Sequence, residues 1–135
     1  MNSEAILVDC CALADLFVGE ADFEQASANL RRKFPIWYSP ALIKAEFGNV
    51  LRTQVRAGKM TAEKALEIWS VAMGKVLLCE EADGAGILKE ANASRLTFYD
   101  ATYVAAARST GLTLYTRDSE ILRNCPEVAQ PISDA

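Results

Sequence analysis

Histidine is absent from this sequence of 135 residues. Without an imidazole, the chain can form neither a Ser-His-Asp nor a Cys-His nucleophile system, and it has no histidine general base. Any chemistry that it performs must therefore use carboxylates, lysine, tyrosine, thiols or a bound metal ion.

Long apolar runs are also missing. Runs such as residues 5–8 and 76–79 are far too short to span a bilayer. The N-terminus has no basic segment, and Glu4 precedes the first apolar run, so we expect no signal peptide and a cytoplasmic protein without membrane contacts. A hydrophobic fraction of 51% and a charged fraction of 24% are typical of a globular chain, which we expect to form one domain over residues 1–135.

The cysteine pattern is not that of a zinc site. The four cysteines include an adjacent pair, Cys10 and Cys11, which is poorly suited to chelation, and the chain has no C-x-x-C motif. In the cytoplasm we expect these cysteines to be reduced thiols.

Positive charge is scarce, because 14 basic residues face 18 acidic ones and the net charge is −4. This balance argues against a general phosphate-binding surface. Two small basic clusters, at residues 31–33 and 52–59, are typical of solvated helix faces.

Segments typical of strands and helices alternate along the chain. We expect strands at residues 5–9, 36–38, 76–79, 112–116 and 128–132, and helices at 12–18, 21–32, 40–57, 61–73, 82–93, 98–110 and 119–123. Thr97 is the expected cap of the helix at 98–110, and Gly111 is expected to end it. Ser39 is the expected N-cap of the third helix, with Pro40 as its first residue. The alternation predicts an α/β sandwich around a mainly parallel sheet.

Two acidic residues lie where strands of such a sheet end. Asp9 ends the first apolar strand, and Asp118 follows the strand at 112–116. Ligands of parallel α/β sheets gather at these carboxyl ends. Either residue could instead be only the N-cap of the helix that follows it.

Two further acids interrupt apolar helix faces. Glu46 shares a face with Leu42, and Asp100 shares one with Tyr103. A carboxylate that points toward a core needs a cation or hydrogen-bond donors. The alternatives are an exposed helix edge for Glu46 and, for Asp100, a capping box with Thr97.

The four acids gain a common explanation if they converge. Asp9, Glu46, Asp100 and Asp118 would repel one another, and the repulsion would raise some of their pKa values. A Mg²⁺ or Mn²⁺ ion, which prefers carboxylate and water ligands, removes that conflict. Such a cluster can hydrolyse phosphodiesters without histidine.

Four segments in this order carry a family resemblance over nearly the whole chain: "ILVDCCAL", "SPALIKAEFGNVLRT", "LTFYDATYVAAA" and "LTLYTRDSEIL". The sequence resembles the PIN-domain ribonucleases and, among them, the small single-domain VapC-type toxins. The resemblance implies a three-layer α/β/α fold and an endoribonuclease. In it, Asp9, Glu46, Asp100 and Asp118 would bind Mg²⁺ or Mn²⁺ and catalyse RNA cleavage.

The resemblance also implies supporting residues and partners. Thr116 matches a hydroxyl residue that positions a ligand or a neighbouring carboxylate. Cys11 replaces the Ser or Thr that is common two residues after the first acid, and a thiol is the weaker donor. The implied partners are RNA, a small antitoxin that lays a helix in a groove, and a second copy of the chain in a homodimer.

Two other functions stay open. The chain could be an inactive PIN-like module that binds RNA or a partner, with Cys11 marking decay of the site. A phosphoacceptor receiver-like domain also places acids at strand ends, but it needs paired acids near the first strand and a lysine late in the chain. The segment "LTLYTRD" has no lysine.

Overall fold

A computed structural model describes residues 4–132, which form five strands and seven helices. The strands are β1 (Ala5–Val8), β2 (Ile36–Pro40), β3 (Val76–Cys79), β4 (Leu114–Thr116) and β5 (Ala129–Pro131). The helices are α1 (Cys10–Val18), α2 (Ala21–Lys33), α3 (Leu42–Arg56), α4 (Ala62–Met73), α5 (Gly84–Ser94), α6 (Phe98–Thr110) and α7 (Ser119–Asn124). None of the helices in this range has the length and hydrophobicity needed to cross a bilayer.

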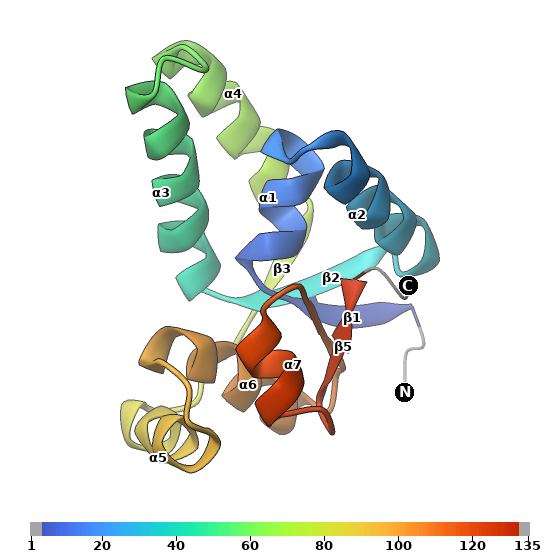
Figure 1. Ribbon diagram of the computed structural model, residues 1–135, viewed down its shortest axis with the longest axis vertical. Coiled ribbons are helices and arrows are strands. Elements are labelled where there is room, and N and C mark those ends of the chain that lie inside the picture. The colour runs from blue at the N-terminus through green and yellow to red at the C-terminus, as the bar shows by residue number, and fades with distance from the viewer. Residues whose placement is uncertain (1–3, 133–135) are drawn as a thin grey trace.

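All neighbouring strands of the sheet are parallel, in the order β3-β2-β1-β4-β5. The central strand β1 pairs with β2 and β4, so that Leu7 lies opposite both Tyr38 and Leu114. Helices α1 to α4 cover one face of the sheet and α5 to α7 cover the other (Figure 1). The expected three-layer α/β/α fold and the last edge strand are thus confirmed.

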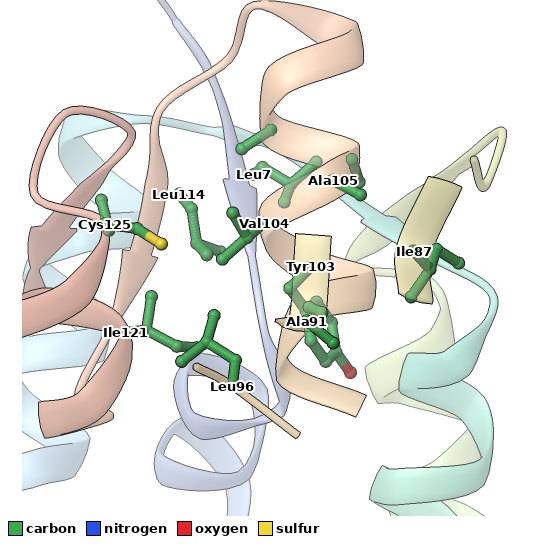
Figure 2. Packing of buried hydrophobic residues seen from close by; sticks show 14 residues of the cluster. Leu7, Ile87, Ala91, Leu96, Tyr103, Val104, Ala105, Leu114, Ile121 and Cys125 are labelled. Atoms are coloured by element: carbon green, nitrogen blue, oxygen red, sulfur yellow. The ribbon is translucent and has the colours of Figure 1, made fainter. Parts of the chain in front are cut away.

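Strand β1 is apolar throughout because both of its faces are buried. Leu7 packs into the core beneath α5, α6 and α7, together with Val104 and Ile121 (Figure 2). Its neighbours Ile6 and Val8 point to the opposite core, beneath α1 to α4. Alternate side chains of a strand face opposite sides of the sheet, and a strand covered on both sides reads as a continuous apolar run.

Helix α1 begins at Cys10, two residues earlier than expected. Its start is fixed by Asp9, whose Oδ1 accepts a hydrogen bond from the N–H of Cys11 at 3.0 Å. The expected ends of α6 are confirmed, because Thr97 caps its first turn and Gly111 follows its last turn with a φ of 73°. This left-handed conformation favours glycine.

The prediction for Ser39 and Pro40 is wrong. Both residues belong to β2, and α3 begins only at Leu42. Pairing of β2 with β3 extends to Pro40, and the Ser39 hydroxyl donates to the carbonyl of Val8 at 2.7 Å. Sheet pairing and a contact to the end of β1 therefore outweigh the local capping preference.

Gly19, directly after α1, lies very close to the backbone of that helix. A Cβ atom there would lie 2.6 Å from Cα and 2.7 Å from the carbonyl oxygen of Asp15, and neither backbone atom can move away cheaply. We expect Gly19→Ala to lower the free energy of unfolding by about 1–3 kcal/mol, the usual cost of overpacking. Urea denaturation measures this loss.

Gly84→Ala is the matched control. A Cβ atom at Gly84 meets nothing within 4 Å. This variant should be unchanged or more stable by about 0.4–1 kcal/mol, because alanine restricts the unfolded chain. Equal losses in the two variants would contradict the close approach at Gly19.

Candidate active site

Asp9 lies at the carboxyl end of the central strand and is only 5% exposed. Its Oδ2 accepts a hydrogen bond from Thr116 Oγ1 at 2.5 Å, and its Oδ1 accepts the N–H of Cys11 at 3.0 Å. Thr116 is the last residue of β4, the next strand of the sheet. The carboxylate is therefore held by two elements at once and also caps α1.

Burial raises the pKa of Asp9 from its ordinary value of 3.8 to about 6. Hydrogen bonds from Thr116 and Cys11 lower this pKa, whereas the negative charge of Glu46 raises it further. Near pH 7 the ionised form is thus retained against an unfavourable environment, which a nearby cation would relieve.

Glu46 reaches the site from α3 and is half-buried. Its Oε1 accepts a hydrogen bond from the hydroxyl of Tyr103, a residue of α6 that is 1% exposed, at 2.5 Å. Burial, followed by this hydrogen bond, raises the pKa of Tyr103, so that the phenol stays a protonated donor. Figure 2 shows Tyr103 in the core, with its oxygen at the margin of the cluster on the side of α3.

Asp100 and Asp118 are close enough to influence each other. Burial, then the charge of Asp118, and then the charge of Glu46 raise the pKa of Asp100. The N–H of Asp100 donates to Thr97 at 3.1 Å, which is the first half of the expected capping box. Asp118 caps α7 through two N–H groups of the first turn. Capping and the shared electrostatic site thus coexist.

Thr116 joins the acids at the two strand ends, because its hydroxyl donates to Asp9 and accepts the N–H of Asp118 at 2.9 Å.

The cysteines beside Asp9 are not reactive thiolates. Burial, followed by the charge of Asp9, raises the pKa of the Cys11 thiol. Burial also raises the pKa of Cys10 to about 12. Both side chains are therefore protonated thiols, and the four cysteines, all within the described range, are free.

The four acids form a chain of electrostatic neighbours, in the order Asp9, Glu46, Asp100, Asp118. Within residues 4–132, however, no three acidic, thiol or imidazole side chains are placed so that they could hold a metal ion. The donor set itself fits a hard divalent cation, because it offers only carboxylate oxygens. The raised pKa values of Asp9 and Asp100 show that their ionised forms are unfavourable here, and a bound cation would stabilise those forms.

Two residues beside the site, Arg117 and Tyr103, have roles that we did not predict from the sequence. Arg117 forms a bidentate ion pair with the buried Asp15 of α1, at 2.5 and 2.8 Å, and lies 3.9 Å above the ring of Phe23. The pair fastens the loop that carries Asp118. The sequence sign of the ion pair was Asp15 itself, a carboxylate in an apolar helix. The sequence sign of the role of Tyr103 was a tyrosine in an alanine-rich helix, because a buried tyrosine hydroxyl needs a hydrogen-bond partner.

Comparison with known families agrees with the fold. The family model of the PIN domain matches residues 6–125, which is most of the chain. The chain belongs to the PIN-domain family. The expected family is thereby confirmed.

Individual PIN-like proteins are similar over different extents. Exonuclease VapC9 of Pyrobaculum aerophilum is 34% identical over 77 residues, covering 57% of this chain and 58% of that protein. The match thus spans little more than half of that relative. The crystal structure of PAE2754 from the same organism superposes with a TM-score of 0.77 at 28% identity, over 96% of this chain and 90% of that one.

A toxin–antitoxin complex from Klebsiella pneumoniae contains a chain of the same fold. It superposes with a TM-score of 0.65 at 17% identity and covers 94% of this chain and 97% of that chain. At this identity, the likeness shows the fold alone.

The raised pKa of Asp9 makes stability depend on pH. The native state binds a proton at Asp9 more readily than the unfolded chain does, so stability from this group is present below about pH 4 and is lost as the pH rises through about 6. Asp9→Asn keeps an oxygen acceptor for Cys11 but replaces the acceptor of the Thr116 hydroxyl with an amide NH2 group, a cost that does not depend on pH. In the metal-free protein we therefore expect the stability of this variant relative to the wild type to rise by up to about 3 kcal/mol between pH 4 and pH 7.5.

Urea denaturation in EDTA between pH 4 and 8 measures this difference. Asp22→Asn, at an exposed position of α2, is the control and should show no comparable rise with pH. If Asp9→Asn had the same effect at pH 4 and pH 7.5, the buried charge would carry no penalty.

Proposed function

We propose that this protein is a divalent-metal-dependent endoribonuclease that hydrolyses RNA phosphodiester bonds and acts as the toxin of a toxin–antitoxin pair. The observation that carries the proposal is the gathering of acidic residues at the carboxyl edge of a PIN-domain sheet: Thr116 is hydrogen-bonded to both Asp9 and Asp118, and the charge of Glu46 acts on both Asp9 and Asp100. The name of one relative, an exonuclease, supports nuclease activity but not internal cleavage, and a structural neighbour from a toxin–antitoxin complex supports the role as a toxin.

In this proposal, Asp9, Glu46, Asp100 and Asp118 hold Mg²⁺ or Mn²⁺. When bound, the ion supplies an activated water and neutralises the charge that develops on the phosphate. The hydroxyls of Thr116 and Tyr103 orient Asp9 and Glu46, each through one carboxylate oxygen, so the second oxygen of Glu46 keeps its capacity as a ligand. Cys11 supplies a weaker thiol contact to Asp9.

Asp100 is the carboxylate best suited to accept a proton from an attacking water. It is half-buried, so that water reaches it, and its pKa is raised by burial and by the charges of Asp118 and Glu46. A general base works best when its pKa approaches the working pH. Asp9 is less accessible because both of its oxygens accept hydrogen bonds.

A groove between α3 and α4 offers a place for the proposed antitoxin. It has a volume of about 470 Å³ and apolar walls that include Leu51, Val55, Leu66 and Trp69. Leu66 is 70% exposed. An amphipathic helix buries its apolar face in a groove of this kind. The homodimer remains a prediction from the family resemblance.

The alternative is an inactive PIN-like module that binds RNA or a partner. One observation favours it: within residues 4–132 the acids do not close around a metal position. Metal-dependent cleavage separates the two functions.

A circular single-stranded RNA gives the sharpest test, because only an endonuclease can open a circle. We expect the wild-type protein to open it with Mn²⁺ and to fail in EDTA. Asp100→Asn should lose about 100-fold or more of the rate, the usual contribution of a positioned acid or base. Denaturing gel electrophoresis measures both rates.

Asp22→Asn is the control for a change of Asp to Asn in the first turn of a helix, and it should cut at the wild-type rate. Trimming of linear RNA with intact circles would instead show an exonuclease. If no RNA of a broad panel of circular and linear substrates is cut and Mn²⁺ does not raise the melting temperature, the nuclease proposal loses most of its support in favour of the inactive module.

A further inference from the structure

A small open pocket adjoins Glu46, between α3 and the start of α6. Its volume is about 280 Å³, and its walls are formed by Leu42, Ala45, Glu46, Asn49 and Tyr99. Sites for whole small-molecule ligands are typically about 300–1,000 Å³. This pocket is thus better suited to one planar ring than to a larger ligand.

The walls of this pocket combine three kinds of surface. Leu42 and Ala45 are apolar, Asn49 offers an amide that both donates and accepts, and Tyr99 presents an aromatic ring that is 61% exposed. Tyr99 lies one helical turn before Tyr103, whose hydroxyl binds Glu46. The exposed ring is therefore placed beside the acidic site by the same face of α6 that orients Glu46.

We propose that this pocket holds a nucleobase of single-stranded RNA, next to the bond that is cut at the acidic site. The base stacks on the ring of Tyr99 and forms hydrogen bonds along its edge with the amide of Asn49. The identity of the ligand as RNA rests on the proposed function, whereas the pocket and its aromatic wall do not.

Charge favours a base over a phosphate in this pocket. Glu46 forms part of its wall and Asp100 follows Tyr99 directly, so that an anion would be repelled. A base is neutral, and its faces stack on aromatic rings whatever its identity, while its edge distinguishes one base from another. Tyr99 would therefore supply affinity, and Asn49 would supply preference for a base beside the cut.

Binding without cleavage tests this inference. The probe is a set of short single-stranded RNAs, each with one 2-aminopurine, titrated with protein in EDTA. Stacking quenches the fluorescence of this base, and we expect quenching at one position of the set. Tyr99→Ala should abolish the quenching and weaken binding roughly 5- to 150-fold, whereas Tyr99→Trp should retain both.

Phe98→Ala is the matched control, because Phe98 is a neighbouring aromatic residue, 46% exposed, that does not line the pocket. It should bind and quench as the wild type does. Asn49→Ala should change which base is preferred at the quenched position. Circular dichroism checks that each variant is folded.

The outcomes separate this inference from the nuclease proposal. Quenching that depends on Tyr99 supports the base pocket even if Mn²⁺ starts no cleavage. Cleavage and binding that Tyr99→Ala leaves unchanged would overturn the base pocket and leave the nuclease intact. Failure of the wild type to bind RNA in EDTA would also overturn the base pocket. So would a Tyr99→Ala variant whose mass in solution differs from that of the wild type but whose RNA binding does not, because Tyr99 would then form a protein contact.

Discussion

The hydrogen bond from Thr116 to Asp9 is the contact on which the site depends most. It joins the carboxyl ends of β4 and β1, two neighbouring strands of the central layer. The same hydroxyl accepts the N–H of Asp118, so one buried side chain fixes the positions of two acids. It also helps to keep Asp9 ionised, because burial alone would raise the pKa of that carboxyl further.

The candidate metal-binding acids accept hydrogen bonds from neutral groups, whereas Asp15, which has a structural role, is paired with a cation. Asp9 and Glu46 accept hydrogen bonds from the hydroxyls of Thr116 and Tyr103, which orient a carboxylate but leave its charge in place. Asp15, in contrast, is paired with the guanidinium of Arg117 in bidentate geometry. A carboxylate neutralised in this way strengthens the fold, whereas acids held by neutral donors keep their charge for a cation.

Local patterns predicted most of the fold, because the elements themselves carry local signals. Thr97 and Gly111 mark the two ends of α6, and the apolar run of β1 reflects its two buried faces. Ser39 misled because its contact to Val8 is made across strands. The order of the acids along the chain was also readable, but their partners were not. Tyr103 lies 57 residues from Glu46, and Arg117 lies 102 residues from Asp15.

The most direct test is a carbon-13 NMR titration of the Asp9 carboxyl group, with and without Mg²⁺. If Asp9 is a buried metal ligand, its carboxyl group should titrate near pH 6 in the metal-free protein, and its pKa should fall well below that value when Mg²⁺ is added. A pKa near 4 without metal, or a pKa near 6 that Mg²⁺ does not change, would contradict the assignment of Asp9 to a metal site.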